Sequence, residues 1–189
     1  MKRVSLSGLE KTVQQVWDWY EVQSTISSQC KGRVIESIRR GTPAPYPSLD
    51  GLSLDEVDDF FDELDDAAML DLMAAAEAAI RLDYLDRVYK RRKDPLSRAF
   101  RRLYQHQGNG VGLEEHILAS WKAEAHDAPT RSAIGDFSGA LNLRHWLAHG
   151  RYYEPRLGHD YSPLDIYSMV VDLLSSLGIL LQPQTVEGK

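Results

Sequence analysis

Residues 143–151, LRHWLAHGR, place one arginine and two histidines within an otherwise apolar helical pattern. The apolar residues Trp146 and Leu147 are expected to pack inward against other elements of the fold. Polar groups among them therefore either cost stability or line a site. We interpret Arg144 and His149 as the centre of a candidate functional site at the end of a helix.

The order of residues in this stretch is an arginine, a polar residue directly after it, three more residues and then a histidine. This order resembles the R-x4-6-H signature of the HEPN superfamily, whose members are all-α and many of which are ribonucleases. Here the signature reads RHWLAH, closes a predicted helix and continues as HGRYY. The KDPLSR stretch at residues 93–98, with the long predicted helix before it, also resembles the plasmid-borne and prophage-type branch of that superfamily.

The length of the chain predicts one domain, residues 1–189, with a proline-rich loop at 42–52 and a flexible tail at 182–189. The single cysteine, Cys30, is typical of a reducing cytoplasm, and we expect it to be a packed residue rather than a reactive one. No run of about 18 apolar residues exists. We therefore expect a cytoplasmic protein with no membrane partner.

Charge is distributed unevenly along the sequence. Residues 55–71 hold nine acidic side chains and no basic one, whereas residues 87–102 hold eight basic side chains and one acid, Asp94. Each run is either a solvated helix face or a surface for a partner protein. A net charge of −6 argues against general coating of nucleic acid, but it leaves room for a local basic site.

Four helix starts are marked by capping chemistry. Residues 7–10 and 53–56 both have the S-x-x-E pattern of a capping box. Asp94 and Ser162 each precede a proline, which suits the first position of a helix because its missing N–H is not needed there.

Apolar periodicity predicts an all-α fold, a helical bundle with short connections. The resemblance implies that this bundle is HEPN-like, up-and-down, with accessory helices. The expected helices are one at 9–29, a short one ending before Gly41, a short acidic one, a long one through Met69 to Val88, and others at 94–108, 113–124, 132–152 and 163–180. The expected core includes Met73, Ile80, Tyr84, Trp146, Leu147, Val170, Leu173, Leu174 and Leu177.

Arg144 and His149 are about 140° apart around an ideal helix and about 7.5 Å apart along it, so they do not share a face directly. His145 and His149, four positions apart, do share one. The family resemblance implies a homodimer, in which two motif helices meet and each site is lined by arginine and histidine from both chains.

This set of side chains suits cleavage of RNA by its own 2′-hydroxyl. Histidine titrates near neutral pH, so His149 is assigned to proton transfer, while the forked cation of Arg144 is assigned to the phosphate. His145 is assigned an orienting role. Arg151, Tyr152 and Tyr153 offer charge and stacking surface to RNA. The alternatives are an ion pair for Arg144, a hydrogen-bonded core or interface residue for His145 and for His149, and tyrosines that only close the core.

The resemblance therefore implies a metal-independent endoribonuclease, a toxin or defence effector with an antitoxin protein as partner. No cofactor and no metal are expected, because the four remaining histidines have no ligand spacing. The alternative is a non-catalytic HEPN module that binds RNA or nucleotide or serves as a scaffold. A third possibility is that residues 143–151 form only a tight interface.

Overall fold

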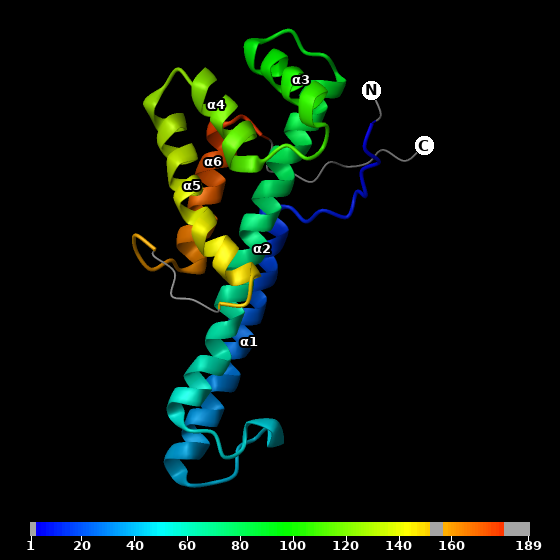
Figure 1. Cartoon of the computed structure of the whole chain (residues 1–189). Helices are drawn as coiled ribbons and strands as arrows, with labels where there is room; N and C mark the ends of the chain where they lie inside the picture. The colour runs from blue at the N-terminus through cyan, green and yellow to red at the C-terminus, as the bar shows by residue number, and fades with distance from the viewer. Residues whose placement is uncertain (1–2, 152–156, 180–189) are drawn as a thin grey trace.

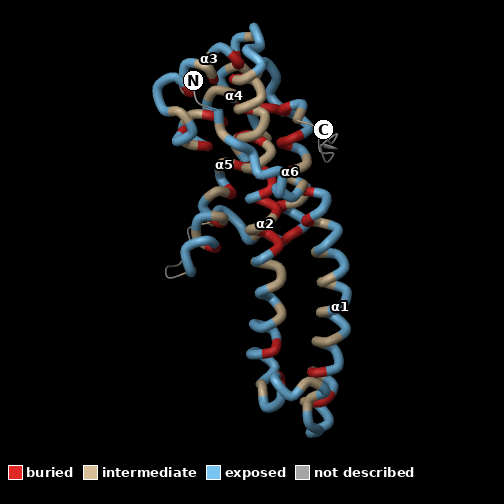
Figure 2. The backbone as a smooth tube through the Cα atoms, turned by 90° about the vertical axis from the view of Figure 1, so that its right-hand side faces the viewer, coloured by how far each residue is buried: buried red, intermediate tan, exposed pale blue. Residues whose placement is uncertain are grey.

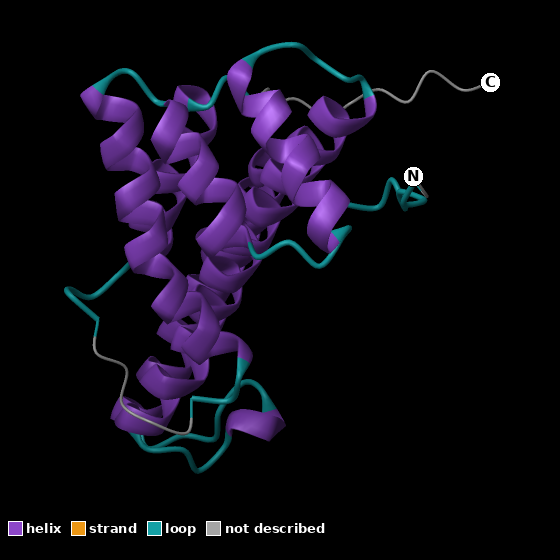
Figure 3. Ribbon diagram, turned by 45° about the horizontal axis from the view of Figure 1, so that its top comes forward, coloured by secondary structure: helices purple, strands orange, loops and turns teal. Residues whose placement is uncertain are grey.

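The computed structural model describes residues 3–151 and 157–179, and every regular element in this part of the chain is helical (Figures 1 and 3). The all-α prediction is confirmed. In chain order the elements are α1 (Val13–Arg40), η1 (Pro47–Leu49), α2 (Leu54–Tyr89), α3 (Pro95–Gln107), η2 (Leu113–Leu118), α4 (Ala119–Glu124), α5 (Ala128–Ala148) and α6 (Pro163–Ser176). None of the described helices is both long enough and apolar enough to cross a membrane.

Helices α1 and α2 form a long antiparallel hairpin. The hydroxyl of Tyr20 donates to Asp65, and Lys31, further along α1, pairs with Asp58, which lies earlier in α2. At the tip of the hairpin Leu49 packs in a small apolar cluster with Val34 and Val57. Figure 2 shows this end projecting from the rest of the molecule. The proline-rich connector thus closes the hairpin.

The C-terminal half of α2 is the centre of the main core. Its buried side chains include Met73, Ile80 and Tyr84, at the helical spacing that the sequence predicts. Helices α3, α5 and α6 lie around this half (Figure 1). The expected core residues are buried with one exception: Trp146 is only partly buried and packs against the core.

Three of the four predicted caps are confirmed. Ser53, Asp94 and Ser162 each accept the backbone N–H of the third residue of their helix. The predicted box at residues 7–10 is wrong, because Gly8 has a φ of +66° and α1 begins after Thr12. A second capping box, between Thr12 and Gln15, starts the helix instead.

Two predicted breaks do not occur. The helix expected to end near residue 29 continues to Arg40 as α1, and the acidic helix and the long helix are one helix, α2. No proline interrupts either span, and Gly32 is the one glycine in α1, where its backbone stays helical. A single glycine costs only about 1 kcal/mol in a helix, so it does not end one.

The motif helix was predicted at residues 132–152 and instead runs from Ala128 to Ala148. It starts earlier because Asp127 caps it, accepting the N–H of Thr130 at 2.7 Å. Helix α6 ends at Ser176 rather than at residue 180, since Gly178 has a φ of +65°. The predicted tail at 182–189 lies outside the described residues.

Candidate functional site

The C-terminal end of α5 carries the motif. His149 is the C-cap, and its N–H donates to the carbonyl of His145 at 3.1 Å. Gly150 follows with a φ of +84°, and the N–H of Arg151 donates back to the carbonyl of Trp146 at 3.2 Å. This six-to-one bond across a left-handed glycine is the Schellman closure, which ends a helix sharply. The sequence therefore places His149 at the helix end, where its side chain meets solvent.

His145 and His149 lie side by side. Their ring centroids are 4.2 Å apart with an angle of 51° between the planes, and both residues are exposed. The shared face predicted from their spacing is present. In such a pair one imidazole can accept a proton while the other donates one.

Arg144 points away from this pair, toward α2. Its Nη2 donates to Oε2 of Glu77 at 3.1 Å, and its Nε is buried without a hydrogen-bond partner among the described residues. Oε1 of Glu77 accepts from Nε of Arg81 at 2.8 Å, so one carboxylate holds two guanidinium groups. Among the described residues no hydrogen bond joins Arg144 to His149. Within one chain the ion pair considered from the sequence is present, and the arginine and histidine are not brought together.

Arg151 fastens the chain leaving α5 to the acidic half of α2. It has a φ of 55° and donates to both oxygens of Glu63, at 2.7 and 3.0 Å. It also pairs with Asp66 at 3.0 Å and lies over the ring of Trp146, 5.8 Å from its centroid.

The hydrogen bonds that Arg151 donates to Glu63 raise the pKa of Arg151 above its usual value. Burial raises the pKa of Asp66 despite the nearby guanidinium of Arg151. The guanidinium of Arg151, which the sequence analysis assigns to RNA, is therefore paired with carboxylates of its own chain. Tyr152 and Tyr153, assigned to base stacking, lie outside the described residues.

Glu77 is the residue at this site that sequence reasoning missed. Its spacing from Arg81, four positions later on the same helix, indicates only a local acid–base pair. A signal was present, because Glu77 falls between Met73 and Ile80 on the apolar stripe of α2. A carboxylate on a buried stripe needs a cation, and Arg144 supplies one.

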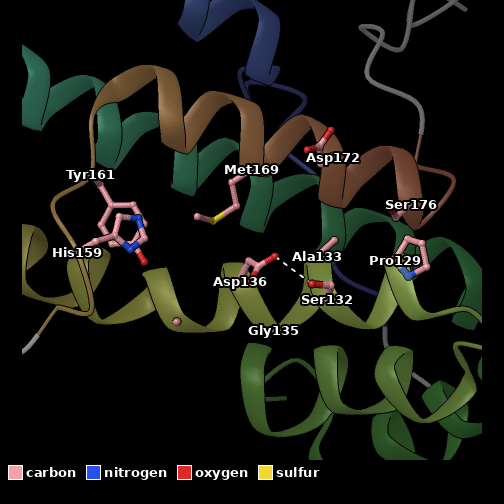
Figure 4. A pocket seen from close by; sticks show the side chains of 11 residues that line it. Pro129, Ser132, Ala133, Gly135, Asp136, His159, Tyr161, Met169, Asp172 and Ser176 are labelled. Carbon is pink, nitrogen blue, oxygen red and sulfur yellow. Dashed lines mark hydrogen bonds between the residues drawn. The ribbon is translucent and has the colours of Figure 1, made fainter.

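A cleft of about 770 Å³ lies between the first half of α5, α6 and the segment before α6, and no motif residue lines it (Figure 4). The hydroxyl of Ser132 donates to Asp136 at 3.4 Å along α5, and Met169 enters the cleft from α6 (Figure 4). His159 and Tyr161 close one end, with ring centroids 4.0 Å apart. Burial, with the charge of Asp136, raises the pKa of Tyr161. Small residues leave the cleft open; they are Ser132, Ala133, Gly135 and Gly139.

The described residues contain no group of three or more His, Cys, Asp or Glu side chains placed to hold a metal ion. Comparison of the chain with protein-family models, curated proteins and solved structures finds no match.

Proposed function

We propose that the chain is a metal-independent endoribonuclease of the HEPN type, acting as a toxin or defence effector. The observation that carries this proposal is the pair of exposed imidazoles, His145 and His149, in the last turn of α5, directly after Arg144 in the sequence. Proton transfer and charge neutralisation are the two tasks that cleavage by a 2′-hydroxyl requires, and these residue types perform them.

In the proposed reaction His149 takes the proton of the 2′-hydroxyl, and the freed oxygen attacks the adjacent phosphorus. The bond from phosphorus to the 5′-oxygen breaks, and that oxygen receives a proton from a second imidazole. A guanidinium neutralises the extra negative charge on the phosphoryl oxygens as the new bond forms. His145 orients the substrate or its neighbour.

A second copy of the chain completes the proposed site, because the guanidinium of Arg144 and the ring of His149 leave α5 in different directions. The face of α5 that carries the histidines supports close approach. Asn142 and Gly135 precede His149 on that face at steps of seven residues, and Ser138 precedes His145 likewise. These are small or polar side chains, and Asn142 is exposed.

The second candidate function is a non-catalytic module that binds RNA or nucleotide, or that serves as a scaffold. One observation favours it: the guanidinium of Arg144 is already neutralised by Glu77. As a binding module or scaffold, the chain would use the guanidinium of Arg144 to stabilise the fold and not to bind a phosphate.

Cleavage of bulk RNA in the presence of EDTA separates the two functions. The endoribonuclease is expected to degrade RNA with the chelator present, and the double variant Arg144→Ala, His149→Ala is expected to be inactive. His126→Ala is the matched control, because His126 is an exposed histidine before α5 and outside the motif. RNA that is bound but left intact by the unchanged protein would support the binding module instead.

A further inference from the structure

The corner where α2 meets α3 holds a cluster of cations that the fold does not use. Three basic residues there are committed to acidic neighbours: Arg87 pairs with Asp83, and Lys90 and Arg92 both pair with Asp86. Four others are exposed, and their side chains have no ion pair or hydrogen bond among the described residues; they are Arg91, Lys93, Arg98 and Arg102. The surface at this corner therefore keeps an excess of positive charge.

The acids of this corner cannot neutralise that excess. Burial works to raise the pKa of Asp86, but its bonds to Lys90 and Arg92 outweigh burial and leave the pKa below its usual range. Asp94 is occupied as the cap of α3, where its two oxygens accept from Ser97. Both carboxylates are thus charged at neutral pH and are already bonded within the chain.

Three of the unpaired cations work against the stability of the fold. Arg98 and Arg102 are four positions apart on the exposed face of α3, a like-charge spacing that costs a few tenths of a kcal/mol. Arg98 also lies near the helix N-terminus, where the helix dipole disfavours a cation. Arg91 has a φ of 51°, a region that costs a residue other than glycine about 1 kcal/mol. These costs indicate a role outside the folding of the chain.

We propose that Arg91, Lys93, Arg98 and Arg102 bind the phosphate backbone of a single RNA strand. Arg91 and Lys93 lie in the turn after α2, and Arg98 and Arg102 lie on α3. Guanidinium groups match the geometry of phosphate, and clustered unpaired cations are the usual basis of binding without sequence preference. The choice of RNA over an acidic protein rests on the proposed function.

The position of this basic corner fits a strand that also reaches the motif. Glu77, which holds Arg144, lies thirteen positions before Lys90 at the end of α2, about 20 Å along the helix. Glu63, which holds Arg151 just beyond His149, lies 27 positions before Lys90, about 40 Å along the helix. Figure 1 shows α3 at the end of the molecule opposite the tip of the α1–α2 hairpin. A strand several nucleotides long can therefore contact the corner and the motif together, whereas a dinucleotide at the motif cannot.

The test measures binding of a fluorescein-labelled single-stranded DNA of roughly 20 nucleotides, a length that spans more than one such contact. This probe lacks the 2′-hydroxyl, so the proposed reaction cannot consume it. Fluorescence anisotropy at several salt concentrations gives both the Kd and its salt dependence. The variant is Arg98→Gln, Arg102→Gln, which is expected to fold at least as well because it removes a like-charge pair.

The matched control is Arg33→Gln, Arg39→Gln, which removes the same charge from two exposed and unpaired arginines on α1. We expect the α3 variant to bind several-fold more weakly, with a slope of log K against log salt reduced by about 1.4, the value for two phosphate contacts to a single strand. The control variant is expected to bind like the unchanged protein.

Equal weakening in both variants overturns the proposal, because general charge then accounts for binding. Unchanged binding in the α3 variant also overturns it and assigns the corner to another partner. The readout is independent of cleavage. If the unchanged protein leaves RNA intact, the endoribonuclease proposal ends. If the α3 variant nevertheless loses affinity for the probe, the proposal that these cations bind phosphate stands.

Discussion

The guanidinium of Arg144 donates to the carboxylate of Glu77 at 3.1 Å and joins the motif helix α5 to α2. The side chain of Glu77 is 19% exposed, and the Nε of Arg144 is buried and has no hydrogen-bond partner in the part of the chain that the structure describes. Without the carboxylate of Glu77, Nη2 of Arg144 would lose its acceptor, and the partly buried guanidinium would have a second unsatisfied donor besides Nε. Breaking a buried pair costs more than breaking an exposed one, because the remaining charge is then uncompensated.

Glu77→Gln is therefore expected to lower the free energy of unfolding by about 1–2 kcal/mol, between the values typical of exposed and buried pairs. Urea unfolding followed by circular dichroism measures this change. Glu36→Gln is the control, because the pair between Glu36 and Arg40 is about half exposed or more on both sides. The control should change stability by less than about 0.5 kcal/mol. Equal effects of the two variants would contradict this view of the Glu77 pair.

Ile80→Ala tests the core at the middle of α2. Ile80 is fully buried and belongs to the cluster that α2 forms with the other helices, so the variant creates a cavity. We expect a loss of about 2–5 kcal/mol, seen as a lower urea midpoint with an unchanged slope. Leu164→Ala, at a position that is 58% exposed, should change stability by less than about 0.5 kcal/mol. A small effect at Ile80 would mean that the core is placed wrongly.

Local chemistry accounts for the parts of the fold that the sequence predicts well. Caps such as those at Ser53 and Ser162 involve residues only three positions apart, and the stripe through Ile80 follows the helical period. The sequence prediction misplaces the start of α1 and the end of α5, because two local signals compete at each. Thr12 offers a second capping box beyond the one at residues 7–10, and Gly150 ends α5 before the pattern of apolar residues does.

The geometry of the candidate site depends on contacts distant in sequence, which no local pattern can supply. The pair of Arg144 with Glu77 spans 67 residues, and the pair of Arg151 with Glu63 spans 88. The spacing of His145 and His149 does predict their shared face, because both lie on one helix. Which way each arginine turns is decided by the acids that the fold of α2 brings beside it.

Tyr84→Phe tests a buried hydroxyl that has no hydrogen-bond partner among the described residues. Burial raises the pKa of Tyr84 to about 12. An unfolded tyrosine titrates near pH 10, so the unfolded chain releases this proton first, and stability falls as the pH rises from about 10 to 12. The variant should change stability at pH 7 by no more than about 1 kcal/mol, toward greater stability, and should lose less stability above pH 10.

Thermal or urea unfolding at pH 7 and across pH 9–12 measures both effects of the Tyr84 variant. Tyr20→Phe is its control, since the hydroxyl of Tyr20 donates to Asp65 at 2.8 Å. Removing that bond should cost about 1 kcal/mol at pH 7. A Tyr84 variant that is the less stable of the two at pH 7 would show that its hydroxyl is bonded after all.

Asn142→Arg tests the proposed homodimer. Asn142 is exposed on the face of α5 that carries His149, and an arginine there adds bulk and a like charge to both copies. Light scattering at micromolar concentration should give twice 21.4 kDa for the unchanged protein and a shift toward 21.4 kDa for the variant. Gln105→Arg on the exposed face of α3 adds the same charge elsewhere and should remain dimeric. A monomer that still cleaves RNA would refute the shared site.

The chemical ends of the RNA products, and a substrate with 2′-deoxyribose at the scissile position, test the reaction itself. If the 2′-hydroxyl is the nucleophile, the products carry a 2′,3′-cyclic phosphate and a 5′-hydroxyl, and a 2′-deoxyribose at the scissile position stops cleavage. His149→Ala should lower kcat by about 100-fold or more, because it removes a proton-transfer group. Arg144→Lys should also be impaired, since lysine keeps the charge but lacks the fork that holds a phosphate. His126→Ala should cleave normally. Full activity in His149→Ala, or efficient cleavage at a 2′-deoxy position, would end this mechanism.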